Sequence, residues 1–250
     1  MNIFSGFGNL PAFTHAVATI GSFDGVHRGH FALLSRVREI AASRGGESIV
    51  FTFEPHPRIT LGKADGLRLL NSADEKLHYL ELAGVDNVVF IPFTLEFSRL
   101  SAAEFIGEFI VGKAGVETLV VGYNHRFGSD RQGGTAFLAD AGVDFVEVGQ
   151  QLAEGDKVSS TVIRRTVADG DMATAWRLLG HPYSVSGTIA EDGELEVSER
   201  EYKLLPPAGV YNARVDDENE FHLTVQDDGR VFADRRPASE RLFIEILGKR

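Results

Sequence analysis

The feature that most constrains the fold is a change of pattern between Ala16 and His30. Ala16–Ile20 is an apolar run typical of a buried β-strand, and helical periodicity begins at His30. Between them lies the turn-forming stretch Gly21-Ser22-Phe23-Asp24-Gly25. Glycine and aspartate at a strand-to-helix junction are typical of a tight turn that faces a phosphate group. The pattern therefore predicts an α/β fold with a ligand site directly after this strand.

Two histidines, His27 and His30, lie on either side of Gly29 at the start of the expected helix. The N–H groups of a first helical turn have no partner within the helix, and the helix dipole is positive there, so this position suits a phosphate. Gly29 has no side chain, so a triphosphate could approach the backbone closely. Neither G-x-x-x-x-G-K-[ST] nor G-x-G-x-x-G follows the strand, which excludes the P-loop and the dinucleotide fingerprint. Histidines at a helix start are often ordinary surface residues, but the flanking turn favours the phosphate site.

Strand and helix patterns alternate through about the first 180 residues. We expect strands at 16–21, 47–53, 87–92, 118–122 and 143–148, and helices at 30–44, 72–83, 102–112 and 134–141. This alternation predicts an α/β, Rossmann-like domain with a parallel sheet over residues 1–182. In such a sheet the ligand lies at the carboxyl ends of the strands.

The pattern changes at Tyr183. Short β-like runs separated by turn residues follow at 183–189, 210–215, 221–225, 230–233 and 242–247. They predict a small antiparallel, β-barrel-like module over residues 183–250.

Composition narrows the possible functions of the chain. None of the 250 residues is cysteine, which excludes disulfides, thiolate catalysis and cysteine-bound zinc. The formal net charge of −11 argues against general nucleic-acid binding, which needs a basic face. No apolar run reaches the roughly 20 residues needed to span a bilayer, and residues 1–15 lack the pattern of a secretory signal. We therefore expect a cytoplasmic protein without nucleic-acid or membrane partners.

Three further segments carry polar side chains at the expected strand ends or helix starts: Phe53-Glu54-Pro55-His56-Pro57-Arg58, Val121-Gly122-Tyr123-Asn124-His125-Arg126-Phe127-Gly128 and Ser159-Ser160-Thr161-Val162-Ile163-Arg164. The third segment predicts a second phosphate-binding helix start, with hydroxyl groups as the cap and Arg164 one turn into the helix. Each has an ordinary structural interpretation as well. The first could be a rigid surface turn, and the third a plain N-cap followed by a surface arginine.

Together these motifs resemble the bacterial bifunctional riboflavin kinase/FAD synthetase family. The H-x-G-H element resembles the signature of the wider nucleotidyltransferase superfamily. The matching stretches lie in the family's order at 19–30, 51–57, 121–128, 159–164 and 170–183. The last of these is family-specific without a known chemical role. The resemblance implies an enzyme that transfers AMP from MgATP to FMN and releases FAD and pyrophosphate.

The resemblance also implies residue roles. His27 and His30 would donate hydrogen bonds to the α- and β-phosphates, while Ser160 and Arg164 would hold the β- and γ-phosphates. Asn124 would orient the phosphates of ATP or the phosphate of FMN, and the Phe53–Arg58 loop would line the isoalloxazine side of the flavin. Further nucleotide or flavin contacts are expected from Gly21, Ser22, Phe23, Asp24, Gly29, Phe53, Pro55, His56, Pro57, Arg58, Phe127 and Thr161. Mg²⁺ is expected to arrive with ATP, because no carboxylate cluster suggests a metal site of the protein's own.

The chain departs from the family pattern in several places. Glu54 stands where the family usually has Asp, and His125 where it usually has Phe. The kinase's glycine-rich stretch and P-T-A-N motif are missing between Ile189 and Leu205, where one glycine and six carboxylates stand instead. Ile244-Glu245-Ile246 resembles the strand that carries the kinase's catalytic glutamate. We therefore expect a shortened, degenerate kinase module without riboflavin kinase activity. A nucleotidyltransferase for another acceptor and a non-catalytic flavin- or nucleotide-binding paralogue remain the alternatives.

Overall fold

The computed structural model describes residues 1–63, 66–123, 125–130, 132–150, 152–153, 156–215, 219–235 and 242–250. The chain forms two compact units. The first contains Met1–Phe23, His30–Gly66 and Leu80–Gln150, and the second contains Asp24–Gly29, Leu67–Tyr79 and Gln151–Arg250. Two short pieces of the N-terminal half thus belong to the second unit.

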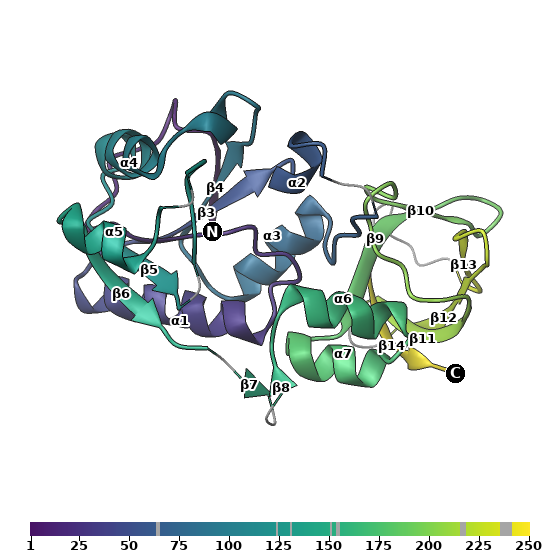
Figure 1. Ribbon diagram of the computed structural model, residues 1–250. Helices are drawn as coiled ribbons and strands as arrows, with labels where there is room; N and C mark the ends of the chain where they lie inside the picture. The colour runs from purple at the N-terminus through teal and green to yellow at the C-terminus, as the bar shows by residue number, and fades with distance from the viewer. Residues whose placement is uncertain are drawn as a thin grey trace. The chain divides into compact units, whose positions relative to one another are not determined.

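The first unit is built on a six-stranded parallel sheet (Figure 1). Its strands, in spatial order, are β1 (Asn2–Ser5), β4 (Asn87–Pro92), β3 (Ser48–Glu54), β2 (Val17–Ile20), β5 (Thr118–Gly122) and β6 (Asp144–Val148). The chain runs from β2 through β3 to β4 on one side, and β5 and β6 lie on the other side. The strand order therefore reverses at β2, and the crevice at the carboxyl end of such a reversal is where open α/β sheets bind ligands. The predicted parallel α/β sheet is confirmed.

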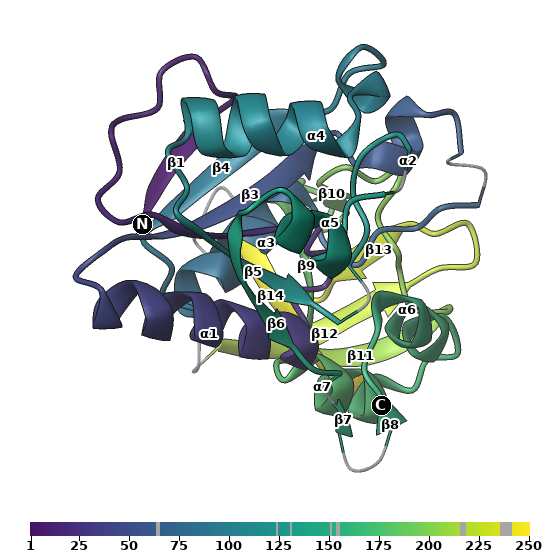
Figure 2. The same ribbon diagram turned by 60° about the vertical axis from the view of Figure 1, so that its left-hand side comes forward.

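Helices cover both faces of this sheet, because alternate residues of the central strands point to opposite sides. Val17 and Val120 pack with apolar residues of α1 (Arg28–Ser43). Ile20 lies in the cluster that includes Phe105 and Ile110. Figure 2 shows α1 along one face and the helix that begins at α4 along the other.

The predicted helix over 102–112 is present but is wound differently. It begins as α4 (Ala102–Glu104), capped by Ser101 and Glu104, and continues as a π-helix, η2 (Phe105–Lys113). The remaining helices of this part of the chain are α2 (Pro57–Thr60), α3 (Ala73–Leu82), whose first residues belong to the second unit, η1 (Phe97–Arg99) and α5 (Thr135–Asp140).

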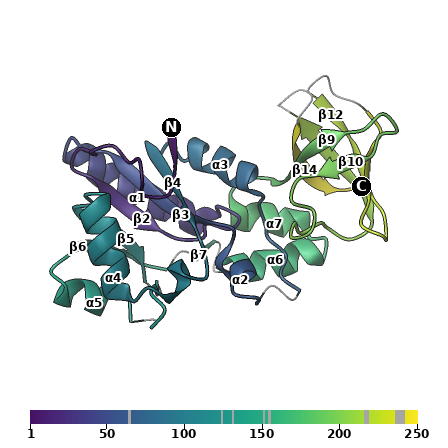
Figure 3. The ribbon, with the colours of Figure 1, turned by 90° about the horizontal axis from the view of Figure 1, so that it is seen from above.

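The second unit combines two helices with an antiparallel sheet. Its helices are α6 (Ser160–Ala168) and α7 (Met172–Leu179), and its sheet has the order β10 (Leu195–Val197), β9 (Tyr183–Ile189), β14 (Leu242–Lys249), β11 (Gly209–Val215), β12 (Asn219–Val225) and β13 (Val231–Ala233). A bridge between Glu194 and Phe232 joins the two ends of this order, so the sheet is nearly closed, as Figure 3 shows. The predicted barrel-like module is confirmed. Two short strands, β7 (Leu152–Ala153) and β8 (Asp156–Lys157), form a separate hairpin.

The barrel shares one apolar core with α6 and α7. Ile163 of α6 and Leu178 of α7 lie in the same cluster as Tyr183, Tyr211 and Ile244. The predicted boundary between the activities, at residues 182 and 183, stays a prediction, because compactness does not assign an activity. Among the described residues, no helix is both long and apolar enough to cross a membrane.

Candidate active site

The turn after β2 is strained. Phe23 and Val26 are buried residues with positive φ angles of 48° and 34°, which bulky and β-branched side chains rarely adopt. Gly25 has a φ of 87°, and a Cβ there would lie 2.6 Å from Cδ1 of Leu70. Strained conformations persist only where surrounding contacts enforce them, and they gather at functional sites.

Asp24 is the residue that fixes this turn. Its Oδ1 accepts hydrogen bonds from the backbone N–H groups of Leu70 at 2.8 Å and Asn71 at 3.3 Å. Its Oδ2 accepts from Nη2 of Arg164 at 2.6 Å, and the residue is only 5% exposed. The Asp24 carboxylate, predicted as a nucleotide contact, is thus engaged by three groups of the chain itself.

The start of α6 is bonded to the same turn. Ser159 is the N-cap, as predicted, and its hydroxyl accepts from the N–H of Val162 at 3.4 Å. The Ser160 hydroxyl donates to the backbone oxygen of Asp24 at 2.8 Å. Thr161 is exposed in the first turn of α6. Asp24 therefore forms one hydrogen-bonded group, the Asp24 group, with Ser160 and Arg164. These two residues lie 136 and 140 positions later in the sequence.

His27 directly precedes α1 and is 7% exposed. Burial lowers the pKa of His27 to about 4, although the nearby Asp24 carboxylate acts in the opposite direction. The imidazole is consequently neutral at neutral pH, and a neutral imidazole still donates one hydrogen bond. His30 is the third residue of α1, beside Gly29, and its ring meets the Phe23 ring edge-on at 5.1 Å between centroids.

His181 is a site neighbour to which sequence reasoning assigned no role. Its Nε2 lies 3.1 Å from the backbone oxygen of Gly25 and its Nδ1 lies 2.8 Å from that of Pro182. Its ring stacks on Tyr79 at 3.5 Å, and burial lowers the pKa of His181 to about 4. The signal was the family-specific stretch at 170–183, which includes this histidine.

The segment predicted to line the flavin belongs to the first unit, and much of it is engaged locally. His56 accepts from the N–H of Arg58 at 3.2 Å and caps α2, in which Pro57 is the first residue. Arg58 donates from Nε to the Lys63 oxygen at 3.2 Å. The peptide bond before Pro55 is cis. In the structure, His56 and Arg58 therefore shape this loop.

The predicted aromatic contacts are part of the first unit's core. Phe53 meets Phe93 edge-on at 5.3 Å, and Phe127, 8% exposed, contacts Phe105 and Phe137. Gly21 and Ser22 are half-buried at the end of β2.

Asn124, predicted to orient the phosphates, lies outside the described residues. Its neighbour His125 is half-buried, and burial of its ring, together with the Arg126 guanidinium, lowers the pKa of His125 to about 4. Its Nε2 has no hydrogen-bond partner in the described part of the chain. The catalytic and binding roles assigned to all these residues stay predictions.

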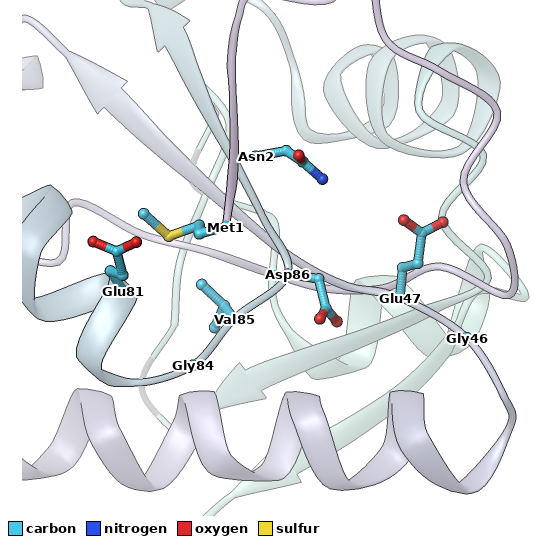
Figure 4. Close-up of a pocket in the computed structure, with 8 residues that line it drawn as sticks. All are labelled: Met1, Asn2, Gly46, Glu47, Glu81, Gly84, Val85 and Asp86. Atoms are coloured by element: carbon cyan, nitrogen blue, oxygen red, sulfur yellow. The ribbon is translucent and has the colours of Figure 1, made fainter.

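A surface hollow of about 480 Å³ lies elsewhere on the first unit, and Figure 4 shows its lining: Met1, Asn2, Gly46, Glu47, Glu81, Gly84, Val85 and Asp86. It lies at the amino ends of β1, β3 and β4, whereas the turn described above follows the carboxyl end of β2. Its Asp86 accepts hydrogen bonds from the N–H and hydroxyl of Ser48, and Glu47 accepts from the N–H of Thr14. Two of its three acidic side chains are thus engaged by the chain, and the negative charge of the lining disfavours a nucleotide.

Comparison with known proteins identifies the family of the chain that carries this site. The family model described as FAD synthetase matches residues 11–162, which include the strained turn, both histidines and Ser160. The chain belongs to the FAD synthetase family. The family match thus covers most of the first unit and reaches the first residues of α6.

Three relatives of the family are named bifunctional riboflavin kinase/FMN adenylyltransferase. The protein from Listeria monocytogenes is 31% identical over 93% of this chain and 80% of its own length. The protein from Pseudomonas fluorescens is 38% identical over 86% and 73%. The protein from Escherichia coli K12 is 37% identical over 78% of this chain and 64% of its own length, so that match spans slightly less than two thirds of the relative.

A solved structure shares the fold of the whole chain. The macrolide-efflux protein from Streptococcus pneumoniae superposes with a TM-score of 0.83 over 100% of both chains. At 23% sequence identity this likeness concerns the fold alone.

Proposed function

We propose that this chain is an FMN adenylyltransferase that converts FMN and MgATP into FAD and pyrophosphate. The observation that carries the proposal is the Asp24 group, which ties the turn carrying His27 to the first turn of α6. The segment Asp24–Gly29, which leads into α1, and the start of α6 both belong to the second unit. Helix N-termini with adjacent imidazole, hydroxyl and guanidinium groups suit a polyphosphate.

In the proposed reaction a phosphate oxygen of FMN attacks the α-phosphorus of ATP in line. The new P–O bond forms as the bond to the bridging oxygen breaks, and pyrophosphate leaves with that electron pair. Such transfers depend on positioning and on charge stabilisation more than on covalent chemistry by the protein. His27, neutral at neutral pH, and His30 act as hydrogen-bond donors to the phosphate oxygens that gain charge.

Arg164 has donors left for a phosphate. One nitrogen, Nη2, is bound to Asp24, while its buried Nε has no hydrogen-bond partner among the described residues. Buried donors are almost always satisfied, so an unused one beside a polar helix start favours a ligand there. The Asp24 carboxylate orients the guanidinium, and the remaining donors of Arg164 hold the β- and γ-phosphates. The one proton of the Ser160 hydroxyl is donated to the Asp24 backbone oxygen, so Ser160 joins them by turning this hydroxyl toward the phosphates.

The metal ion enters this scheme as part of the MgATP substrate. In the described ranges, no three His, Asp or Glu side chains form a group that could hold a metal. That Mg²⁺ comes with ATP, and that ATP and FMN are the only partners the site needs, are parts of the proposal. A cytoplasmic location fits the absence of cysteine.

We also propose that the barrel module does not phosphorylate riboflavin. Glu245, in the position of the kinase's catalytic glutamate, is 22% exposed on its side chain and is paired with Arg214 through Oε2 and Nε at 2.5 Å. This carboxylate oxygen is thus held by the guanidinium and is not free to accept a proton from a substrate hydroxyl. The stretch that replaces the kinase's glycine-rich segment, residues 190–204, contains β10 and the connections on either side of it. It carries six carboxylates, which repel a triphosphate.

One assay tests both proposals. The purified chain is incubated with MgATP, pyrophosphatase and either FMN or riboflavin, and the flavins are separated by chromatography. We expect FAD from FMN and unchanged riboflavin in the parallel reaction. No FAD would overturn the transferase proposal, and conversion of riboflavin to FMN would overturn the second. Release of pyrophosphate with a different phosphate acceptor, but not with FMN, would favour a nucleotidyltransferase of other specificity.

A further inference from the structure

Within the second unit, the segment Glu199–Leu204 is bonded to the segment Leu67–Ala73. The N–H of Leu69 donates to the Tyr202 oxygen at 2.6 Å, and the N–H of Leu204 donates to the Leu69 oxygen at 2.8 Å. The N–H of Ala73 donates to Oε1 of Glu199 at 2.8 Å. The segment Glu199–Leu204 lies in the interval where the family's kinase motif is missing, so this interval has a structural partner of its own.

Lys203 is the centre of this contact. Its ammonium group donates to the Leu70 oxygen at 2.6 Å, to Oε2 of Glu75 at 2.5 Å and to the Ser184 oxygen at 2.7 Å. The side chains of Lys203 and Glu75 are both 0% exposed. An ammonium group has three protons, and here each has an acceptor. Burial lowers the pKa of Lys203, and the Glu75 carboxylate opposes that shift.

Glu75 is bound on its other side as well. Its Oε1 accepts from the N–H of Ser186 at 2.6 Å, and its Oε2 also accepts from the N–H of Ser72 at 3.1 Å. The pair therefore joins the start of α3 to β9. Because both charges are fully bonded, the position of the Leu70 carbonyl is fixed from the side of the barrel.

Leu70 connects this pair to the candidate active site. Its carbonyl accepts from Lys203, while its N–H, with that of Asn71, donates to Oδ1 of Asp24. The other oxygen of Asp24 holds Arg164. A continuous series of hydrogen bonds thus runs from Glu75 and Lys203 through one peptide to the arginine expected to bind phosphate.

We propose that Lys203 and Glu75 are positioning residues for adenylyl transfer, acting through Leu70 and Asp24 on Arg164. The inference rests on the proposed function of the same site. A buried ion pair contributes little net stability compared with apolar residues of similar size. Its effect here is geometric, since a displaced Arg164 guanidinium binds the phosphates of ATP more weakly. The barrel module therefore serves the transferase even without kinase activity.

The test replaces the charged pair by a neutral one of similar shape, Glu75→Gln with Lys203→Met, so that no charge is left buried alone. Gln keeps an oxygen for the N–H of Ser186. We expect the KM for ATP to rise by roughly tenfold, the scale of one weakened phosphate contact, with the KM for FMN unchanged. A lower kcat with both KM values unchanged would indicate only a smaller folded fraction and would overturn the inference.

A double-mutant cycle with Arg164→Ala tests the route of the effect. If the pair acts through Arg164, the neutral pair should have little further effect on kcat/KM for ATP once Arg164 is removed. Multiplication of the two separate effects would overturn the inference, because independent sites behave in that way.

Glu199→Ala provides a variant that leaves the buried pair intact, in case the neutral pair does not fold. It removes the acceptor for the N–H of Ala73 at an exposed position and should raise the KM for ATP by roughly threefold, whereas Glu199→Gln should restore it. The matched control is Glu201→Ala, an exposed carboxylate of the same segment with no bond to Leu67–Ala73 among the described contacts. An unchanged KM for Glu199→Ala, or an equal rise for Glu201→Ala, would overturn the inference.

Wild-type chain assayed in parallel separates failure of the proposed function from failure of this inference. No FAD from wild type overturns both of them. FAD from wild type with unchanged variants overturns this inference alone.

Discussion

Replacing Asp24 by Asn is the most direct test of how the strained turn is held. The substitution keeps the shape of the side chain, and its carbonyl oxygen can still accept from the N–H groups of Leu70 and Asn71. The amide group, however, takes the place of the oxygen that accepts from Arg164, so two donors face each other. The variant thus changes one contact and leaves the other two possible.

The expected loss follows from burial. Removing one partner of a buried ion pair costs about 3–5 kcal/mol, and a hydrogen bond to a charged group contributes about 1.5–3 kcal/mol. The Asp24 side chain is 6% exposed but that of Arg164 is 23% exposed, so water can partly solvate the arginine. We therefore expect Asp24→Asn to lower the free energy of unfolding by about 2–3 kcal/mol.

Urea denaturation at neutral pH measures this loss, and Asp144→Asn is the matched control. Asp144 also pairs with an arginine, Arg44, at 3.0 Å, but the two side chains are 56% and 40% exposed. A pair exposed to this degree contributes at most about 1 kcal/mol. If Asp24→Asn were no more destabilising than Asp144→Asn, the argument that Asp24 holds the turn through a buried pair would be refuted.

Three further predictions concern the histidines and Arg164. His27→Ala and His30→Ala should each slow FAD formation by roughly 10²–10³-fold, because the lost hydrogen-bond donor acts on charge that develops in the transition state. FMN binding should change far less, and near-normal turnover in both variants would contradict this role. Arg164→Lys should raise the KM for ATP and lower kcat together, since a point charge lacks the guanidinium's paired donors, and steady-state kinetics equal to wild type would make Arg164 a structural residue only. Burial lowers the pKa of His27, His125 and His181 from 6.5 to about 4, so the unfolded chain binds protons more readily between these values. Urea midpoints should therefore fall as the pH is lowered from about 6.5 to 4 and should not depend on these groups above about pH 7; a flat profile across that range would contradict the burial argument.

Strands bounded by clear turns could be predicted from the sequence, and irregular ones could not. The apolar runs at β4 and β9 agree with the structure residue for residue, because each begins and ends at a change of composition. The edge strand β1 has four residues and is mostly exposed, so no apolar pattern marks it. The helix over 102–112 was predicted from its apolar residues, but those residues do not distinguish α-helical from π-helical hydrogen bonding.

The site shows the same division between local and distant contacts. The Ser159 cap was predictable because the cap and its N–H partner lie three residues apart. The ion pair of Asp24 and Arg164 joins residues that are 140 positions apart. Nothing in the sequence around either residue indicates which residue it pairs with. The acidic interval that contains Lys203 was interpreted only as a damaged kinase motif, because the sequence does not reveal that its one lysine is buried.

The division of the chain into units affects the order in which the enzyme can be completed during synthesis. Asp24–Gly29 is made early, yet it belongs to a unit whose other members are Leu67–Tyr79 and Gln151–Arg250. Its bonds to Ser160 and Arg164 close loops of 136 and 140 residues. Contacts of such long range form late, after the entropy of closing the loop has been overcome. A growing chain on the ribosome therefore carries His27 long before Asp24 can bind Ser160 and Arg164, and the turn is held in place only when the second half of the protein has emerged.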